Sequence, residues 1–166
     1  MMRFENSFLY LMEVFYGLLI RMGNRFQSLF LLYMRLTWGH QFFLTGWGKL
    51  HAIERTATFF ATLNIPHPLF NAYLVGYVEC IGGICLMFGF ASRLICIPLI
   101  INMITALSTA HYNEISHWRF ITDPLSLVRQ TPYPFLLTIL LVFIFGPGRV
   151  SIDAWLKRWA QNRKRY

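Results

Sequence analysis

The segment NAYLVGYVECIGGICLMFGF, residues 71–90, is apolar along nearly its whole length but carries one acidic side chain, Glu79, near its middle. At a rise of about 1.5 Å per residue, a helix of this length crosses the roughly 30 Å hydrocarbon core of a bilayer. An ionised carboxylate at that depth is unfavourable unless it is paired with a cation, protonated or next to water. The fold and the function of the chain therefore depend on what surrounds Glu79.

The composition of the 166-residue chain is that of a membrane protein, because 56% of the residues are hydrophobic and only 13% are charged. Three runs, residues 29–49, 69–90 and 94–112, are long enough to span a bilayer. A fourth and shorter run, residues 133–147, starts next to a proline and ends in a Gly-Pro-Gly sequence that would terminate a helix. We therefore predict an all-α fold, an integral membrane four-helix bundle.

Three further segments complete the expected organisation. Residues 1–27 contain a short apolar run with Glu13, which favours an N-terminal interfacial amphipathic helix, with a fifth span as the alternative. Residues 28–156 are expected to form the transmembrane domain, which closes with a C-terminal amphipathic helix, and residues 157–166 form a basic tail. Residues 51–68, between the first two spans, predict a short helix that ends before a Pro-His-Pro sequence.

The formal net charge of +8 does not indicate a nucleic-acid partner, because the basic residues are spread over loops and tails between apolar spans. If both termini lie on one side of the membrane, most Arg and Lys residues lie on that side as well. The positive-inside rule then places both termini in the cytoplasm. The expected partner of the basic tail is the anionic surface of the lipid bilayer.

Small and polar residues share one face of the first span. The residues of this stripe are Arg35, Gly39, Phe42, Gly46 and Lys49, which recur at alternating steps of four and three. Glu79 of the second span shares a face with glycines in the same way. Because glycine lets a neighbouring backbone approach closely, we predict that these two faces pack together.

Depth along the helices suggests which groups meet Glu79. Counted from the cytoplasmic ends at 1.5 Å per residue, Arg35 lies at about 10 Å, Asn102 at about 14 Å and Glu79 at about 16 Å. A long Arg side chain would cover the remaining distance, so we predict an Arg35–Glu79 ion pair with Asn102 at the same level. Such a pair either fixes the register of the helices or lines a polar pocket for a small ligand or for protons.

Other polar residues give weaker signals. His111, Glu114 and His117 are separated by three-residue steps and are weak metal-ligand candidates, but histidine is also tolerated in wet loops, so we predict no metal site. The cysteines lack C-x-x-C spacing, which favours small buried hydrophobes over a redox dithiol. Ser151 and Asp153 fit the cap and first turn of a helix, with a catalytic Asp153 as the alternative.

Several ordered motifs resemble the DoxX family of small bacterial and archaeal membrane proteins. They are Arg35, GHQFFLTGWGKL (39–50), LNIPHP (63–68), VECIGGICLMFGFASR (78–93), NMITALSTAH (102–111) and GPGRVSID (146–153). The resemblance covers about residues 31–156, and the family's recurrent polar positions fall on Arg35, Lys49, Glu79, His111, Ser151 and Asp153. The long N-terminal extension and the lack of a paired cysteine motif depart from the family pattern.

The resemblance implies a four-helix membrane protein of the bacterial inner membrane, related to the small membrane subunit of a thiosulfate:quinone oxidoreductase. It also implies soluble redox or thiol-handling enzymes as partners. We therefore expect a redox-associated subunit that binds a quinone-like or other small molecule in a pocket lined by Arg35, Gly39, Lys49, Glu79, Asn102 and His111. The alternative is a non-enzymatic solute transporter or a scaffold for partner enzymes; an oligomer is compatible with either. The substrate, the electron donor and enzymatic activity itself are left open by the sequence.

Overall fold

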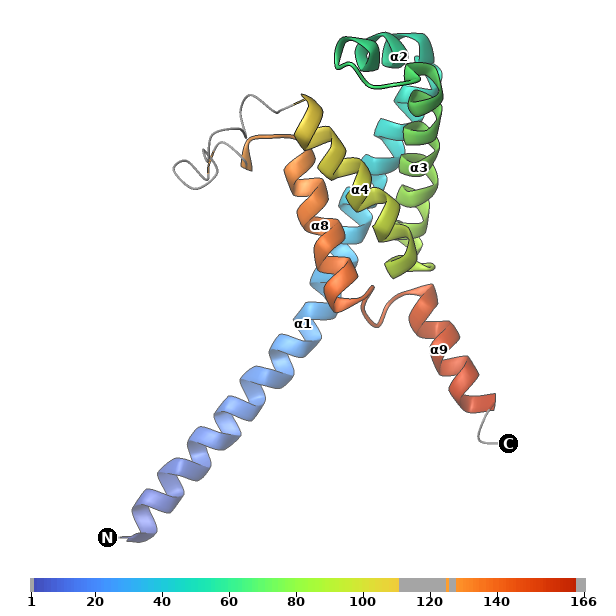
Figure 1. The fold of residues 1–166 in the computed structure, drawn as a ribbon. Helices are drawn as coiled ribbons and strands as arrows, with labels where there is room; N and C mark the ends of the chain where they lie inside the picture. The colour runs from blue at the N-terminus through green and yellow to red at the C-terminus, as the bar shows by residue number, and fades with distance from the viewer. Residues whose placement is uncertain (1, 111–124, 126–127, 164–166) are drawn as a thin grey trace.

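The protein folds into helices only, over the residues that a computed structural model describes: 2–110, 125 and 128–163. In chain order these are α1 (Met2–His51), α2 (Ile53–Thr62), α3 (Pro68–Phe88), α4 (Ser92–Ala110), α8 (Pro132–Phe145) and α9 (Ile152–Arg163). Figure 1 shows α3, α4 and α8 beside the second half of α1, with α2 across one end of this group and α9 at the other. The all-α prediction is confirmed for this part of the chain.

Helix α1 is one uninterrupted helix of 50 residues, about 75 Å long at the standard rise. The prediction that residues 1–27 form a separate helix was wrong for the described part, since residues 2–27 continue directly into the first predicted span. This segment contains no proline, and its glycines, Gly17 and Gly23, are accommodated within the helix. Whether this half of α1 lies in the membrane interface stays a prediction. Figure 1 shows that α1 begins and α9 ends at the same end of the bundle.

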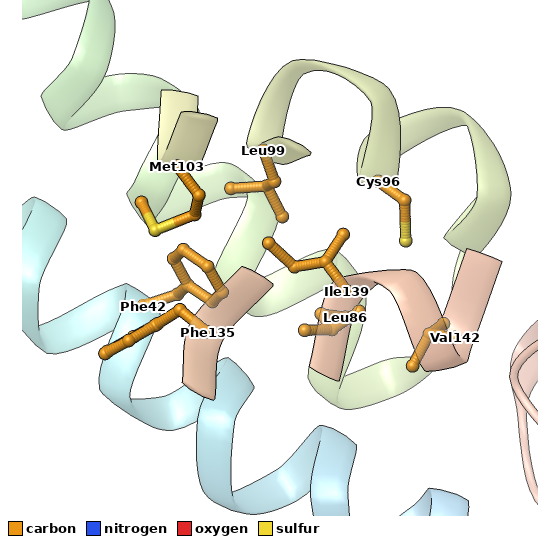
Figure 2. Packing of buried hydrophobic residues seen from close by; sticks show 8 residues of the cluster. All are labelled: Phe42, Leu86, Cys96, Leu99, Met103, Phe135, Ile139 and Val142. Atoms are coloured by element: carbon orange, nitrogen blue, oxygen red, sulfur yellow. The ribbon is translucent and has the colours of Figure 1, made fainter. Parts of the chain in front are cut away.

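Helices α1, α3, α4 and α8 share one apolar core. Phe42 of α1, Leu86 of α3, Leu99 of α4 and Ile139 of α8 are completely buried and belong to a single cluster (Figure 2). Phe135 of α8 meets Phe42 edge to face, with ring centroids 4.6 Å apart. Lipid tails are as apolar as these side chains, so inside a membrane the core stabilises the fold mainly through close packing.

Glycines bring α1 and α3 into direct backbone contact, as the sequence predicts. A Cβ atom added to Gly83 would lie 2.6 Å from the carbonyl oxygen of Gly39, and one added to Gly46 would lie 2.6 Å from the backbone nitrogen of Cys80. Neither backbone has room to give way. The two helices therefore depend on these glycines for their separation.

Two of the described helices, α3 and α4, are long and apolar enough to cross a membrane, while α8 is apolar but shorter. Their outward faces carry large exposed apolar side chains, including Tyr77, Ile81 and Ile101, each more than half exposed. Such a surface suits lipid and not water. That all four core helices span the membrane stays a prediction.

Candidate functional site

Glu79 is the centre of a buried polar cluster that joins three helices. It lies on α3 near mid-length, and only 3% of its side chain is exposed. Its Oε2 atom accepts a hydrogen bond and ion pair from the ammonium of Lys49, and its Oε1 atom accepts a hydrogen bond of 2.8 Å from the Asn102 amide. Both carboxylate oxygens are thus bound, which is the condition for keeping a charge in the interior.

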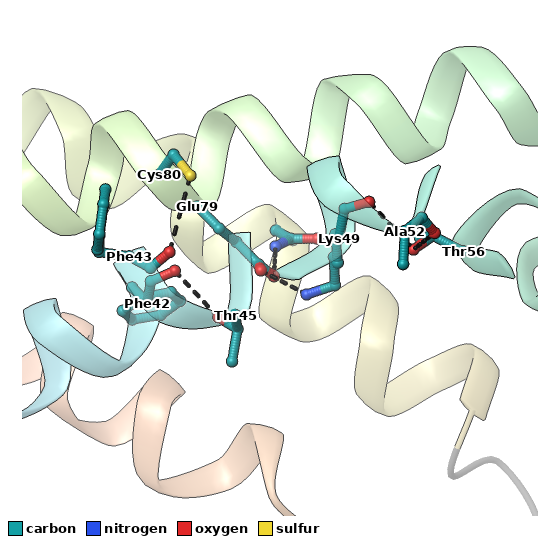
Figure 3. Close-up of polar contacts among 9 residues, drawn as sticks. Phe42, Phe43, Thr45, Lys49, Ala52, Thr56, Glu79 and Cys80 are labelled. Carbon is teal, nitrogen blue, oxygen red and sulfur yellow. Dashed lines mark hydrogen bonds and ion pairs between the residues drawn. The ribbon is translucent and has the colours of Figure 1, made fainter. Parts of the chain in front are cut away.

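Lys49 reaches Glu79 because of the direction that helical side chains take. The Cα–Cβ bonds of a helix tilt toward its N-terminus, so Lys49, in the last turn of α1, extends back along the bundle toward its middle. Gly46, on the same face of α1, lies against the backbone next to Glu79 and brings the two helices close. Figure 3 shows the contact between Lys49 of α1 and Glu79 of α3. With 29% of its side chain exposed, Lys49 also touches the surroundings of the bundle.

The predicted Arg35–Glu79 ion pair was wrong. Arg35 is buried, but its guanidinium donates hydrogen bonds to the carbonyl oxygens of Pro147 and, at 2.8 Å, of Val150. The reason is again side-chain direction: Arg35 extends toward the N-terminus of α1 and thus away from Glu79. The structure places Gly46 level with Glu79, and Gly46 stands about 16 Å further along α1 than Arg35.

A cavity of about 300 Å³ opens beside the Lys49–Glu79–Asn102 cluster. Its walls come from α2, the turn that follows it, α3 and α4, and they are mainly apolar. Phe59 and Phe60 of α2 line the cavity, and so do Thr105 and Thr109 of α4. The cavity therefore combines apolar walls with one charged and hydrogen-bonding end, which is the usual composition of a small-molecule site.

A second, smaller cavity of about 130 Å³ shares Lys49, Glu79 and Ala106 with the first. Its remaining walls include Phe42 and Phe135 of the core. The ion pair thus borders two adjoining cavities. A ligand in either one would contact the same pair of charges.

The caps predicted near the C-terminus are present, with one difference. Ser151 Oγ accepts a hydrogen bond of 3.1 Å from the backbone N–H of Ala154, which makes it the N-cap of α9. Asp153 does not serve its own helix; its two oxygens accept hydrogen bonds of 2.8 Å each from the backbone N–H groups of Ala91 and Ser92, at the start of α4. Asp153 is thus bound by the backbone of another helix, and this supports a structural role for Asp153 over the catalytic alternative.

Gly89, which ends α3, lies beside these caps in a left-handed conformation with a φ of 66°. A Cβ atom there would meet the guanidinium of Arg35 and would lie 2.6 Å from Cβ of Ser151. Arg35, Gly89, Ser151 and Asp153 therefore form a packed joint between the interior of α1, the end of α3 and the starts of α4 and α9, distant from Glu79.

The remaining predicted residues lie elsewhere. Gly39 is buried in the α1–α3 contact near Met87 and Gly83. His111, Glu114 and His117 fall outside the described residues, as does most of the second outer loop. Within the described ranges, no group of three or more metal-ligating side chains comes together. All three cysteines are described, and each is a free thiol.

Comparison with known proteins shows the family of the chain. A family model described as DoxX matches residues 30–112, a range that contains Arg35, Lys49, Glu79 and Asn102. YqjF, an inner membrane protein of Escherichia coli (strain K12), is 32% identical over 123 residues, which cover 71% of this chain and 85% of YqjF. The chain belongs to the DoxX family.

Two further relatives of this DoxX protein differ in what their names describe. CatD of Bacillus subtilis (strain 168), provisionally named an oxidoreductase, is 26% identical over 131 residues, which cover 79% of this chain and 90% of CatD. The membrane protein Rv3486 of Mycobacterium tuberculosis is 28% identical over 105 residues, which cover 61% of this chain and 64% of Rv3486. No solved structure matches the chain.

Sequence reasoning found the residues of the Lys49–Glu79–Asn102 cluster but missed the pairing within it and two further features of the structure. Lys49 was expected to line the pocket, yet its role as the partner of Glu79 was assigned to Arg35. Its position three residues after Gly46, together with the tilt of helical side chains, is the signal that identifies it. The apolar walls that α2 contributes, and the reach of Asp153 to α4, depend on how the helices fold back and have no local sequence signal.

Proposed function

We propose that this DoxX protein is a multi-pass protein of the bacterial inner membrane that binds a quinone-like molecule beside Lys49, Glu79 and Asn102 and serves a redox system as its membrane subunit. The observation that carries the proposal is the cavity of about 300 Å³ with apolar walls and a charged, hydrogen-bonding end. The oxidoreductase name of CatD supports a redox role, and the name of YqjF supports the location.

The polar end of the cavity suits the chemistry of a quinone. The Lys49 ammonium has three N–H donors, of which Glu79 accepts one, so the others can reach a carbonyl oxygen of a bound ring. The apolar walls suit the ring itself. When the ring is reduced, negative charge develops on its oxygens, and a nearby ammonium in a site of low polarity stabilises that charge strongly.

The electrons would come from a soluble dithiol enzyme. Oxidation of its two thiols to a disulfide releases two electrons and two protons, and reduction of the quinone to the quinol takes up the same number. The cysteines of this chain serve poorly as the donor, because Cys96 is completely buried in the core and the sequence contains no C-x-x-C dithiol motif.

The proposed topology has four spans, namely α3, α4, α8 and the second half of α1, with both termini in the cytoplasm. Two observations support it. Helix α1 begins and α9 ends at the same end of the bundle (Figure 1). That end also carries Arg93, Arg149 and Lys157, as the positive-inside rule requires of a cytoplasmic face.

Binding of decylubiquinone to the full-length protein in nanodiscs tests the proposal, with quenching of tryptophan fluorescence as the readout. Asn102→Leu removes a donor from the polar end, and Ala106→Leu fills the space between the two cavities without altering a charge. We expect each change to weaken binding at least about tenfold, the effect of losing about 1.4 kcal/mol. Glu54→Gln, at an exposed acid of α2 away from the cavity, is the matched control and should leave the affinity unchanged.

Equal affinities for all three variants and the unchanged protein would remove the cavity as the quinone site. A dithiol donor can then be added to the same nanodiscs. Reduction of the quinone that depends on the donor and on this protein supports the redox role, and its absence despite tight binding contradicts that role.

A second candidate is a non-enzymatic transporter or scaffold that uses the same cavity. The observation that favours it is the ion pair between two adjoining cavities, because a charged pair in such a position can separate two compartments. Flux of a small solute in liposomes, without quinone reduction, would favour this candidate. The completely buried Phe42, Leu86, Leu99 and Ile139 argue against it, since they fill the bundle between the cavities and the other end.

A further inference from the structure

A third and larger cavity, of about 660 Å³, lies at the end of the bundle opposite to the Glu79 cluster. Its walls come from α1, the start of α4, the end of α8, the Gly146–Pro147–Gly148 turn and the first turns of α9. Leu31 of α1 lines it, and Leu31 stands about 27 Å along the helix from Lys49. This cavity takes no part in the function proposed above.

Three cations line this cavity, which is called the groove from here on: Arg93 of α4, Arg149, which follows the turn, and Lys157 of α9. All three are exposed, and in the part of the chain that the structure describes none of them forms an ion pair. Arg93 donates one hydrogen bond, of 3.4 Å, to the carbonyl oxygen of Ile144, which leaves most of its guanidinium donors available. Cations gathered around a cavity from three segments create a site for an anion.

The acid that lines the groove does not neutralise these cations by direct contact. Asp153 uses both of its oxygens to accept the backbone N–H groups of Ala91 and Ser92, each at 2.8 Å. These N–H groups belong to the start of α4, where the helix dipole is positive, so the carboxylate is already stabilised. The groove keeps an excess of positive charge.

Apolar side chains at the edge of the groove indicate what kind of anion fits. Leu94 is 70% exposed and Phe145 is 56% exposed, and both line the groove next to the outward faces of α4 and α8. The exposed rings of Trp155 and Trp159 on α9 are typical of the boundary between headgroups and acyl chains. A ligand that meets these walls joins an anionic group to an apolar chain, as a phospholipid does.

We infer that this groove binds the phosphate headgroup of an anionic phospholipid, with Arg93, Arg149 and Lys157 around the phosphate and the acyl chain along Leu94 and Phe145. The cytoplasmic leaflet, which this end of the bundle faces in the proposed topology, carries anionic lipids. Headgroup binding would hold α9 against α1 and α4, and thus join the surface helix to the bundle.

Thermal unfolding of the full-length protein in a neutral detergent tests the inference, with dioleoylphosphatidylglycerol as the probe. Dioleoylphosphatidylcholine and inorganic phosphate are the comparison ligands. We expect phosphatidylglycerol to raise the melting temperature in a saturable manner, and the other two not to. The triple variant Arg93→Gln, Arg149→Gln, Lys157→Gln lacks all three cations. Each lost cation should weaken binding about fivefold, so the phosphatidylglycerol concentration that gives half of the maximal stabilisation should rise about 100-fold.

The matched control is Arg21→Gln, Arg25→Gln, Arg163→Gln, which removes three exposed cations of the same end that do not line the groove. In this control, the phosphatidylglycerol concentration that gives half of the maximal stabilisation should change less than threefold. Equal loss in both triple variants, or equal protection by phosphatidylcholine, would overturn the inference in favour of general attraction to anionic lipid. Protection by inorganic phosphate with the same dependence on the groove would overturn the lipid as the ligand. The single variant Lys157→Gln, on the surface of α9, repeats the test if the triple variant does not fold.

Discussion

The buried ion pair predicts an unequal response to removing its two members. Lys49→Met removes the cation, so that Asn102 alone binds the carboxylate of Glu79, whose side chain is only 3% exposed. Breaking a buried ion pair in this way costs about 3–5 kcal/mol of folding stability. Glu79→Gln leaves Lys49, whose side chain is 29% exposed and can turn outward, and the glutamine oxygen can still accept from Asn102. We expect this second change to cost about 1 kcal/mol.

For a chain of this size, about 1 kcal/mol corresponds to 2–4 °C in melting temperature, so Lys49→Met should lower it by on the order of 10 °C and Glu79→Gln by about 3 °C. The double variant Lys49→Met, Glu79→Met should return to within a few degrees of the unchanged protein, because an apolar pair replaces the ionic one. The melting temperature can be measured in mild detergent with a thiol-reactive fluorescent dye. Cys96 is completely buried in the folded protein, so the dye reacts with it only when the bundle unfolds.

Arg55→Met is the control for the loss of a basic side chain, since Arg55 is exposed on α2 and lines none of the three cavities, and it should leave the melting temperature unchanged. Equal losses for the two single variants would refute the argument that their different burial decides the cost. A double variant as unstable as Lys49→Met would show that the pair contributes more than mutual compensation of charge.

Three further predictions use the same dye-based melting assay. Gly83→Ala should lower the melting temperature by several degrees, because its Cβ would lie 2.6 Å from the carbonyl oxygen of Gly39, whereas Gly48→Ala, in open space, should be neutral or raise it; equal effects would contradict the glycine contact. Asp153→Ala removes both hydrogen bonds to the start of α4 and should cost about 1–3 kcal/mol; an unchanged melt would show that water replaces the carboxylate. Arg35→Lys should also destabilise, by about 2 kcal/mol, because one ammonium cannot match the two carbonyl contacts of the guanidinium, and tolerance of lysine would contradict this role.

The helices and their closest contact could be predicted from the sequence because both depend on local patterns. Long apolar runs marked α3 and α4, and the turn signals before Pro68 marked the end of the α2 segment. The glycine spacing on α1 and α3 predicted that these two helices pack together, since glycine at helical spacing has few other uses in an apolar helix; the pairing of Gly39 with Gly83 is seen only in the structure. The level of Asn102 with Glu79 followed from the rise of a helix alone.

The errors arose where a single helical turn or the direction of a side chain decides the outcome. Arg35 was matched to Glu79 by height and reach, but a helical side chain leads toward the N-terminus, and this rule reverses the choice in favour of Lys49. The continuity of α1 was not predicted, because the short apolar run with Glu13 was interpreted as an interfacial helix of its own. No proline interrupts residues 2–27, so the helix continues into the first predicted span.

The position of Asp153 has a mechanical consequence. The residue belongs to α9, yet the backbone groups that it binds belong to the start of α4, so α9 cannot move away from the bundle without breaking hydrogen bonds of a core helix. Lateral tension or bending of the bilayer that pulls on α9 would therefore be transmitted into the bundle. Arg35, which holds the Val150 carbonyl just before α9, makes this linkage a double one.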